Sequence, residues 1–404
     1  MAARRTGGTV VSTNTGPLAG VKVIDMSVMI SGPLSAMMLA DQGADVIKVE
    51  SPGIGDMMRF LGSQKGGETG IFALHNRGKR SIGVNLKSDE GRDVLRRLLS
   101  DADVLIQNFR PGALEKLGFG YDDVRKFNDR IVYVSISGFG QDGPRSGQRV
   151  YDNVIQAASG LASVQTDKAT GRPQIFRTLV CDKVTSYTVA QAVTAALFAR
   201  ERGNGGQHIE VAMIDSAIAF MWPDSAMDAA LLDDDVMRTP TIGENYAALE
   251  LKDGFVTVSA VSQPEFEGYC AALGNPGLAK DPRFADAAAR SANTAELRLE
   301  IKKLTDAITV EEFLANAVVH DVPASGINTL HTVHEEPQVV HNGSFVVREH
   351  PQAGMIREAR HAPRFGGTPT EHPAPAPVRG QHSDEIVSGL GLDAEALRAS
   401  GAIF

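Results

Sequence analysis

Short apolar runs alternate with helix-like segments along the first half of the chain. Four of these runs are rich in Val and Ile and are expected to be buried strands: residues 20–27, 45–49, 104–106 and 131–137. Between them, apolar residues recur at every third or fourth position, which predicts helices over 34–42 and 88–99. Strands that alternate with helices favour a parallel sheet covered by helices, an α/β fold of the doubly wound type.

The most regular helix pattern lies near the middle of the chain. Residues 183–202 are rich in alanine, carry apolar residues at every third or fourth position, and end at a run of glycine and asparagine, 203–206. The apolar run 175–181 and a single acid, Asp182, precede this helix. Its carboxylate is open to two interpretations, an N-cap that accepts backbone N–H groups of the first turn or a catalytic group. The local sequence alone favours the N-cap.

The second half of the chain has a different character. Residues 250–260 read as a hairpin around Asp253 and Gly254, and helices are expected over 264–273, 294–307 and 310–319. Proline then becomes frequent, and two short helical segments close the chain at 384–389 and 393–400. The expected division is a flexible tail at 1–17, a large α/β domain at 18–215, a linker at 216–240, a small α+β domain at 241–325, a linker at 326–350 and a C-terminal return at 351–404 that completes the large domain.

Composition narrows the classes of function. The 404 residues carry a formal net charge of −9, which argues against a general nucleic-acid binder and requires a local basic patch for any anionic ligand. The two cysteines, Cys181 and Cys270, form neither a disulfide framework nor a CxxC motif, so a reducing, cytoplasmic location is expected. No run of eighteen apolar residues predicts a membrane span.

The residues that carry chemistry leave few options. A GxGxxG at 138–143 is followed by Pro144, so no helix opens there to receive a pyrophosphate. The histidines lack metal-ligand spacing, and Cys181 lies beside Asp182, whose charge makes the thiol a poor nucleophile. Carboxylate chemistry remains. Basic residues are expected in loops that follow strands, either as a phosphate site or as ordinary solvated charge, the latter being favoured locally: Arg77, Lys79, Arg80, Arg110 and Lys116.

Segments spread over nearly the whole chain match, in order, those of one enzyme family. They are residues 18–25, 43–50, 76–82, 108–112, 137–140, 151–160, 205–215, 323–330 and 375–385. Through these segments the chain resembles the class III coenzyme A transferases, the CaiB/BaiF family that includes formyl-CoA transferase and α-methylacyl-CoA racemase. The resemblance implies a Rossmann-like large domain, a smaller α+β domain and an interlocked homodimer.

The resemblance also implies a site. Asp182 matches the family's catalytic aspartate, which attacks an acyl-CoA thioester and later carries CoA as an aspartyl thioester. An aspartate of ordinary pKa, about 3.9, is ionised at neutral pH and needs no general base. The turn that stabilises the oxyanion falls at Ile30 and Ser31. The CoA site maps onto Leu74, Asn76, Arg77, Lys79, Arg80, Asn108, Phe109, Arg110, Lys116, Leu117, Ser137 and Tyr151.

The implied reaction moves CoA from an acyl-CoA donor to a carboxylic acid acceptor, with the CoA thioester as substrate and with neither a metal nor a tightly bound cofactor. The chain departs from formyl-CoA transferase at Ile30, where that enzyme has glutamine, and at Ser137, where it has lysine. These departures leave the donor and acceptor open. A racemase would need a histidine where this chain has Tyr151, and a phenol is a poor base at neutral pH. A racemase, a thioester hydrolase and a non-catalytic CoA-binding protein remain as alternatives.

Overall fold

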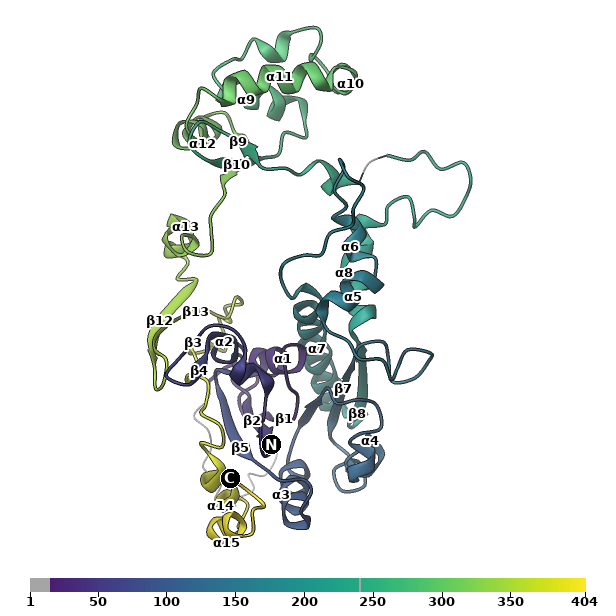
Figure 1. Cartoon of the computed structure of the whole chain (residues 1–404), viewed down its shortest axis with the longest axis vertical. Helices are drawn as coiled ribbons and strands as arrows, with labels where there is room; N and C mark the ends of the chain where they lie inside the picture. The colour runs from purple at the N-terminus through teal and green to yellow at the C-terminus, as the bar shows by residue number, and fades with distance from the viewer. Residues whose placement is uncertain (1–14, 240) are drawn as a thin grey trace. The chain divides into compact units, whose positions relative to one another are not determined.

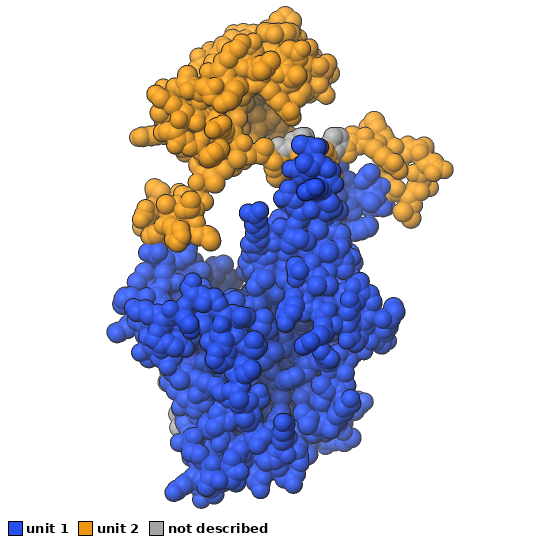
Figure 2. Space-filling model, viewed as in Figure 1, with its two compact units in different colours: residues 1–230, 344–404 blue, residues 231–343 orange. Residues whose placement is uncertain are grey.

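A computed structural model describes residues 15–239 and 241–404. Residues 1–14 of the predicted tail lie outside this range. The chain divides into two compact units, shown in Figure 2. The large unit comprises the described residues up to 230 together with 344–404, and the small unit comprises 231–343. No helix in the described part is long and apolar enough to cross a membrane.

A six-stranded parallel sheet forms the centre of the large unit (Figure 1). Its spatial order is β5-β2-β1-β6-β7-β8, which is 3-2-1-4-5-6 when these strands are counted along the chain. The strands are β1 (Lys22–Asp25), β2 (Asp45–Glu50), β5 (Lys79–Gly83), β6 (Val104–Gln107), β7 (Val132–Ser137) and β8 (Gln207–Ala212). This is the doubly wound order, so the predicted parallel α/β sheet is confirmed. The strand order reverses between β1 and β6, where such sheets bind their ligands.

Helices cover both faces of this sheet. Successive strand residues point to opposite faces, so Val23 packs with α1, α7 and α8, whereas Ile24 packs with α3 and α14. The helices of the large unit are α1 (Ser31–Ala40), α2 (Gly70–Asn76), α3 (Asp89–Ser100), α4 (Tyr121–Val124), α5 (Asp152–Ala158), α6 (Leu161–Val164), α7 (Val180–Ala199), α8 (Met213–Ser225), α14 (Ser383–Gly389) and α15 (Ala394–Ala399).

Shorter elements complete the large unit. They are the 3₁₀ turns η1 (Met57–Phe60) and η2 (Glu115–Leu117), the π-helical turn η3 (Arg200–Asn204), the hairpin of β3 (Gln64–Lys65) and β4 (Glu68–Thr69), and the hairpin of β12 (Phe345–His350) and β13 (Gly354–Ala359). The β3–β4 hairpin and η1 lie in a glycine-rich segment, residues 51–70, for which no helix or strand was predicted. Five helices of the large unit, α2, α4, α5, α6 and α8, were not predicted.

The small unit has its own core. The hairpin predicted around Asp253 is confirmed, because β9 pairs antiparallel with β10. The predicted helices are confirmed as α9, α11 and α12, which pack around Phe313 and Phe284. The elements of the small unit are η4 (Ile242–Asn245), β9 (Leu249–Glu250), β10 (Phe255–Val258), α9 (Gln263–Ala272), η5 (Leu278–Lys280), α10 (Ala287–Ala292), α11 (Thr294–Thr305), α12 (Val310–Val319), β11 (Ala324–Gly326), η6 (Val333–Glu335) and α13 (Pro337–His341).

The C-terminal residues cover the β5 edge of the sheet. The His382 N–H donates to the Ser81 carbonyl at 2.9 Å, and the Gly83 N–H donates to Ser383 Oγ at 3.1 Å. Further along, the Asn85 N–H donates to the Ala402 carbonyl at 2.8 Å. The backbone groups of this edge strand are therefore paired with the chain's own end rather than open to another chain.

Candidate active site

Asp182 lies in the first turn of α7, three residues after the N-cap residue Leu179. The prediction that Asp182 caps this helix is therefore wrong, because the helix begins at Val180 rather than at 183. The Asp182 carboxylate instead accepts hydrogen bonds from the hydroxyl and the backbone N–H of Ser31. Ser31 opens α1, which packs against α7 (Figure 1). The carboxylate is thus placed at the N-termini of two helices, where negative charge is stabilised.

The surroundings of Asp182 shift its acidity upward. Burial is the largest cause, the hydrogen bonds from Ser31 act in the opposite direction, and the nearby charge of Asp152 adds to the rise. Together they raise the pKa of Asp182 to about 6. The carboxylate is therefore ionised at neutral pH, as expected, but far closer to its titration than an exposed aspartate. Its side chain remains partly exposed, so a substrate can reach it.

Asp152, which opens α5, joins the site through the backbone. Its Oδ2 accepts the Asp182 N–H at 3.0 Å, and its Oδ1 accepts from Gln156 Nε2. Gln156 also bonds the segment before α7, accepting the Phe176 N–H at 2.8 Å. Asp152 was not predicted as a site residue, although it lies in a segment that carried the family resemblance. Its position directly after Tyr151 was the signal that could have found it.

The turn between β1 and α1 carries the two residues predicted to stabilise an oxyanion. Ile30 is buried and is the N-cap residue of α1, and Ser31 follows it as the first helical residue. Asn108, at the end of β6, exchanges two hydrogen bonds with the Val28 backbone: its Oδ1 accepts the N–H at 3.0 Å, and its Nδ2 donates to the carbonyl at 2.7 Å. Both polar atoms of the Asn108 side chain therefore hold the backbone of this turn, which lies at the switch point of the sheet.

Three of the predicted CoA-site cations lie in ion pairs. Arg77 is buried and bonds both oxygens of Asp41, at 2.8 and 2.7 Å. Lys79 is buried, and its Nζ lies 2.8 Å from Asp25 Oδ2 and 2.7 Å from Asn76 Oδ1. Arg80 pairs with Asp45 at 2.7 Å and with Glu385 at 3.0 Å. Arg77 is the C-cap residue of α2, and Lys79 and Arg80 open β5, so their predicted placement in loops after strands is wrong.

Two other predicted cations are open to a ligand. Arg110 and Lys116 follow β6, and both are exposed. Within the described part of the chain, neither side chain has a hydrogen bond or ion pair. Leu117 beside them is exposed as well, whereas Phe109 packs against the sheet core. This loop lies at the carboxyl end of the strand that supplies Asn108.

The remaining predicted CoA-site residues lie on separate elements. Leu74 is exposed on α2, while Asn76 on the same helix is buried and bonded to Lys79. Ser137 ends β7, and its Oγ accepts the Gly140 N–H at 3.0 Å. Tyr151, at the start of α5, is 67% exposed, so its ring is not part of the core.

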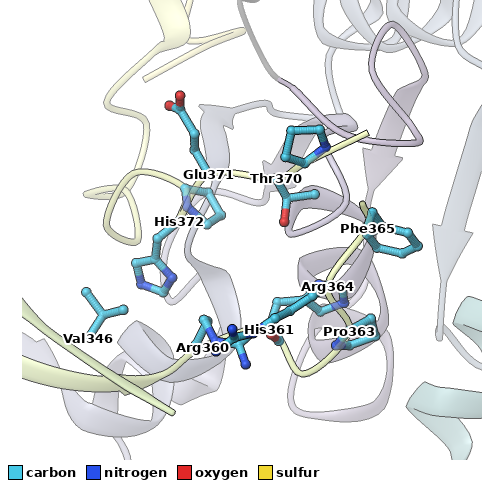
Figure 3. A pocket seen from close by; sticks show the side chains of 11 residues that line it. Val346, Arg360, His361, Pro363, Arg364, Phe365, Thr370, Glu371 and His372 are labelled. Carbon is cyan, nitrogen blue, oxygen red and sulfur yellow. Dashed lines mark hydrogen bonds between the residues drawn. The ribbon is translucent and has the colours of Figure 1, made fainter. Parts of the chain in front are cut away.

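A cavity of about 290 Å³ lies elsewhere in the large unit, in the C-terminal residues (Figure 3). It is lined by Val346, Arg360, His361, Pro363, Arg364, Phe365, Pro369, Thr370, Glu371, His372 and Pro373. None of the residues predicted for catalysis or CoA binding lines it.

The alternatives to Asp182 at this site are the Cys181 thiol and side chains that could bind a metal ion. Burial is the main cause that raises the pKa of the Cys181 thiol to about 12, with the charges of Asp152 and Asp182 adding to it. This direction was predicted from the neighbouring acid. Among the described residues, no three His, Cys, Asp or Glu side chains gather closely enough to hold a metal ion. Asp182 is therefore the candidate reactive group of this site.

The fold and the site together are those of a doubly wound α/β enzyme built around one desolvated aspartate. Residues 18–383 match the sequence family described as CoA-transferase family III, and the chain belongs to this family. It is a class III CoA-transferase, and the predicted family is confirmed.

The sequences of known proteins match almost the entire chain. A succinate–glutarate CoA-transferase of Agrobacterium fabrum is 34% identical over 384 residues, covering 93% of this chain and 96% of its own. A formyl-CoA:oxalate CoA-transferase of Escherichia coli O157:H7 is 30% identical and covers 95% and 98%. The crystal structure of a CaiB/BaiF family protein from Brucella suis has a TM-score of 0.82 at 33% identity, covering 93% of this chain and all of that one.

Proposed function

We propose that this CoA-transferase works through a covalent aspartyl-CoA thioester on Asp182. The observation that carries the proposal is the partly exposed carboxylate held by Ser31 at the N-terminus of α1, at the switch point of the sheet. A carboxylate in this position is ionised at neutral pH, reachable, and surrounded by donors suited to developing negative charge.

The proposed reaction has balanced steps. An Asp182 oxygen attacks the acyl-CoA carbonyl, and the C–S bond breaks to give a mixed anhydride and CoA thiolate. The thiolate attacks the Asp182 carbonyl carbon, the anhydride C–O bond breaks, and the donor carboxylate leaves. The acceptor carboxylate then attacks the aspartyl thioester and releases thiolate. The thiolate finally attacks the acceptor's acyl carbon, which restores Asp182. The anhydrides are of higher energy than the thioesters, but overall one thioester is exchanged for another, so the transfer needs no external source of energy.

The chain's own residues have distinct proposed roles. Each attack creates an oxyanion, and the backbone N–H groups that open α1 at Ile30 and Ser31 are its proposed donors. The Ser31 hydroxyl orients the resting carboxylate. For CoA, the exposed Arg110 and Lys116 are the proposed phosphate contacts, because Arg77 and Lys79 are already paired with carboxylates.

The substrates and the assembly also belong to the proposal. Because relatives carry the names of succinate, glutarate, formyl-CoA and oxalate transferases, short dicarboxylic acids are the first acceptors to test. The family resemblance adds an interlocked homodimer. Large exposed apolar side chains support an association, among them Leu232 at 91% and Leu330 at 92%. Two free, buried cysteines agree with a cytoplasmic location.

The test is a transfer assay with a defined panel. The protein is incubated with succinyl-, acetyl- or formyl-CoA and with ¹³C-labelled succinate, glutarate or oxalate, and label in the acyl-CoA pool is measured by mass spectrometry. Transfer by the wild type and none by Asp182→Ala supports the proposal. Deuterium uptake at the acyl α-carbon without transfer would instead show a racemase, and loss of thioester with no new acyl-CoA a hydrolase. No reaction with any member of the panel counts against the proposed substrate class.

A further inference from the structure

The turn between β1 and α1 is held by side-chain hydrogen bonds, most of which come from elsewhere in the sequence. The Ser27 N–H donates to Asp25 Oδ1 at 2.9 Å, and the Ser27 carbonyl accepts from Lys48 Nζ, also at 2.9 Å. The Met29 N–H donates to Asp56 Oδ1 at 3.1 Å. With the two bonds from Asn108 to Val28, the backbone of three successive residues is fixed from β2, η1 and β6.

The charges beneath this turn are fully buried. Lys48 and Asp56 are both inaccessible to solvent, and Lys48 Nζ lies 2.9 Å from Asp56 Oδ2 and 3.8 Å from Asp25 Oδ2. Lys79 reaches the same Asp25 oxygen at 2.8 Å, so two lysines face two aspartates. Buried ion pairs contribute little net stability compared with apolar residues of the same size. Stability alone therefore does not explain why buried ion pairs occupy this place.

The backbone at this turn is in an unfavourable conformation. Met29 has φ of +66°, in the left-handed region that non-glycine residues rarely occupy. Such a conformation persists only where the surroundings determine it, and it is concentrated at functional sites. Two residues later, Ser31 meets Asp182. A change in the backbone at Met29 would rotate the start of α1 and move the Ser31 donors away from the carboxylate.

We infer that Lys48 and Asp56 are positioning residues, which hold Met29 in its left-handed conformation and thereby align the Ser31 donors with Asp182. The inference rests on the proposed role of Asp182. Neither side chain reaches the substrate, since both lie inside the protein. Their effect passes through the Ser27 and Met29 backbone.

The main variant is Asp56→Ala, which removes the acceptor of the Met29 N–H and one partner of Lys48. We expect kcat to fall about 100-fold, as for an ångström-scale misplacement, while KM for acyl-CoA changes less than about threefold. The acid limb of the pH–rate profile should move to higher pH, because Asp182 loses donors that favour its ionised form. Asp56→Asn keeps the acceptor oxygen and should recover at least about tenfold of the lost kcat.

The matched control is Arg200→Gln. Arg200 is also buried and pairs with Asp103 at 2.8 Å, at the opposite, amino-terminal edge of the sheet. This variant should lose stability without a change in kcat or in the pH profile. The inference is overturned if folded Asp56→Ala keeps kcat within threefold of the wild type, or if its acid limb coincides with that of Arg200→Gln.

A measurement without substrate separates this inference from the proposed function. With ¹³C-carboxyl aspartate, the Asp182 resonance is assigned by its loss in Asp182→Asn and titrated in the ligand-free protein. We expect a higher midpoint in Asp56→Ala than in the wild type, even if no acyl-CoA tested is a substrate. Should Asp56→Ala not fold, the half-buried and uncharged Asn108→Ala releases the same turn at Val28 and should give the same rise. An unchanged midpoint contradicts the inference.

Discussion

Asp182 owes its properties to contacts that are remote in sequence. Ser31 and Asp152 precede it by 151 and 30 residues, and both bond it directly. Local sequence could place an acid near a helix start, but it could not distinguish the N-cap from the third helical residue. The difference decides the chemistry, because a capping carboxylate would be occupied by its own helix. Here the carboxylate points to the start of another helix.

Replacing Ser31 by alanine tests the hydroxyl that faces this carboxylate. Hydrogen bonds to a charged group are worth about 1.5–3 kcal/mol, so its loss should raise the pKa of Asp182 above about 6 and move the acid limb of activity up by about one pH unit. The pH–rate profile of transfer measures this. Ser35→Ala, on the same helix and bonded to the Gly32 carbonyl, is the matched control. An identical acid limb in both variants would show that the Ser31 hydroxyl does not act on Asp182.

Ionisation of Asp182 should oppose folding. Its folded pKa, about 6, lies above the ordinary value of 3.8, so its stabilising contribution is complete below pH 3.8 and is lost as pH rises through about 6. Asp182→Asn should therefore raise the free energy of unfolding at pH 8 by about 1–3 kcal/mol, with a smaller gain at pH 4. Urea unfolding of the ligand-free protein at both pH values measures this. The exposed Asp233→Asn is the control, and an equal gain in that variant would refute the assignment.

At the scale of elements, the close approach of α1 to the preceding turn depends on Gly32. A Cβ added there would lie 2.2 Å from the Ser27 Cβ, so Gly32→Ala must push the turn and the helix start apart. We expect a loss of activity of about 100-fold, since Ser31 moves with the helix. Gly206→Ala creates a similar clash with the backbone of Arg130 and Ile131, away from the site. It should destabilise the protein and leave kcat intact. If Gly32→Ala and Gly206→Ala lost the same activity, the loss in Gly32→Ala would be due to unfolding and not to displacement of Ser31.

Four of the six strands of the central sheet, β1, β2, β6 and β7, could be predicted because their Val and Ile runs fill the two buried faces of the sheet. Helix α8 was missed because Met213–Ser225 has no clear apolar period and contains Pro223. Helix α2 was missed because it follows a glycine-rich segment, although Thr69 caps it by accepting the Phe72 N–H.

The candidate site could be predicted only in part. The resemblance supplied Asp182, Ile30 and Ser31, and the structure brings Asp182 and Ser31 together. The sequence alone could not indicate which cations are buried. Lys79 and Arg110 are both basic residues of the predicted site, but of these two only Lys79 is buried against a carboxylate. Charge alone does not reveal burial, because it depends on which strands become neighbours.

At the scale of the large unit, the end of the chain stabilises the edge of the sheet. Ile403 is 1% exposed and forms a bridge with Val84, beside β5. Ile403→Ala should lower the free energy of unfolding by about 2–5 kcal/mol, and Ile403→Val by about 0.5–1.5 kcal/mol. Denaturant unfolding measures both. Two variants as stable as the wild type would show that the chain end does not pack there in solution.

The covalent step on Asp182 is the central claim, and the most direct measurement is the mass of the enzyme during turnover. The protein is mixed with an acyl-CoA that it turns over, quenched in acid within one turnover, and analysed intact and after digestion. The account predicts a mass gain of CoA less one water, located on the peptide that contains Asp182 and absent in Asp182→Ala. An enzyme that transfers CoA without this adduct, or that carries it on another residue, would contradict the account.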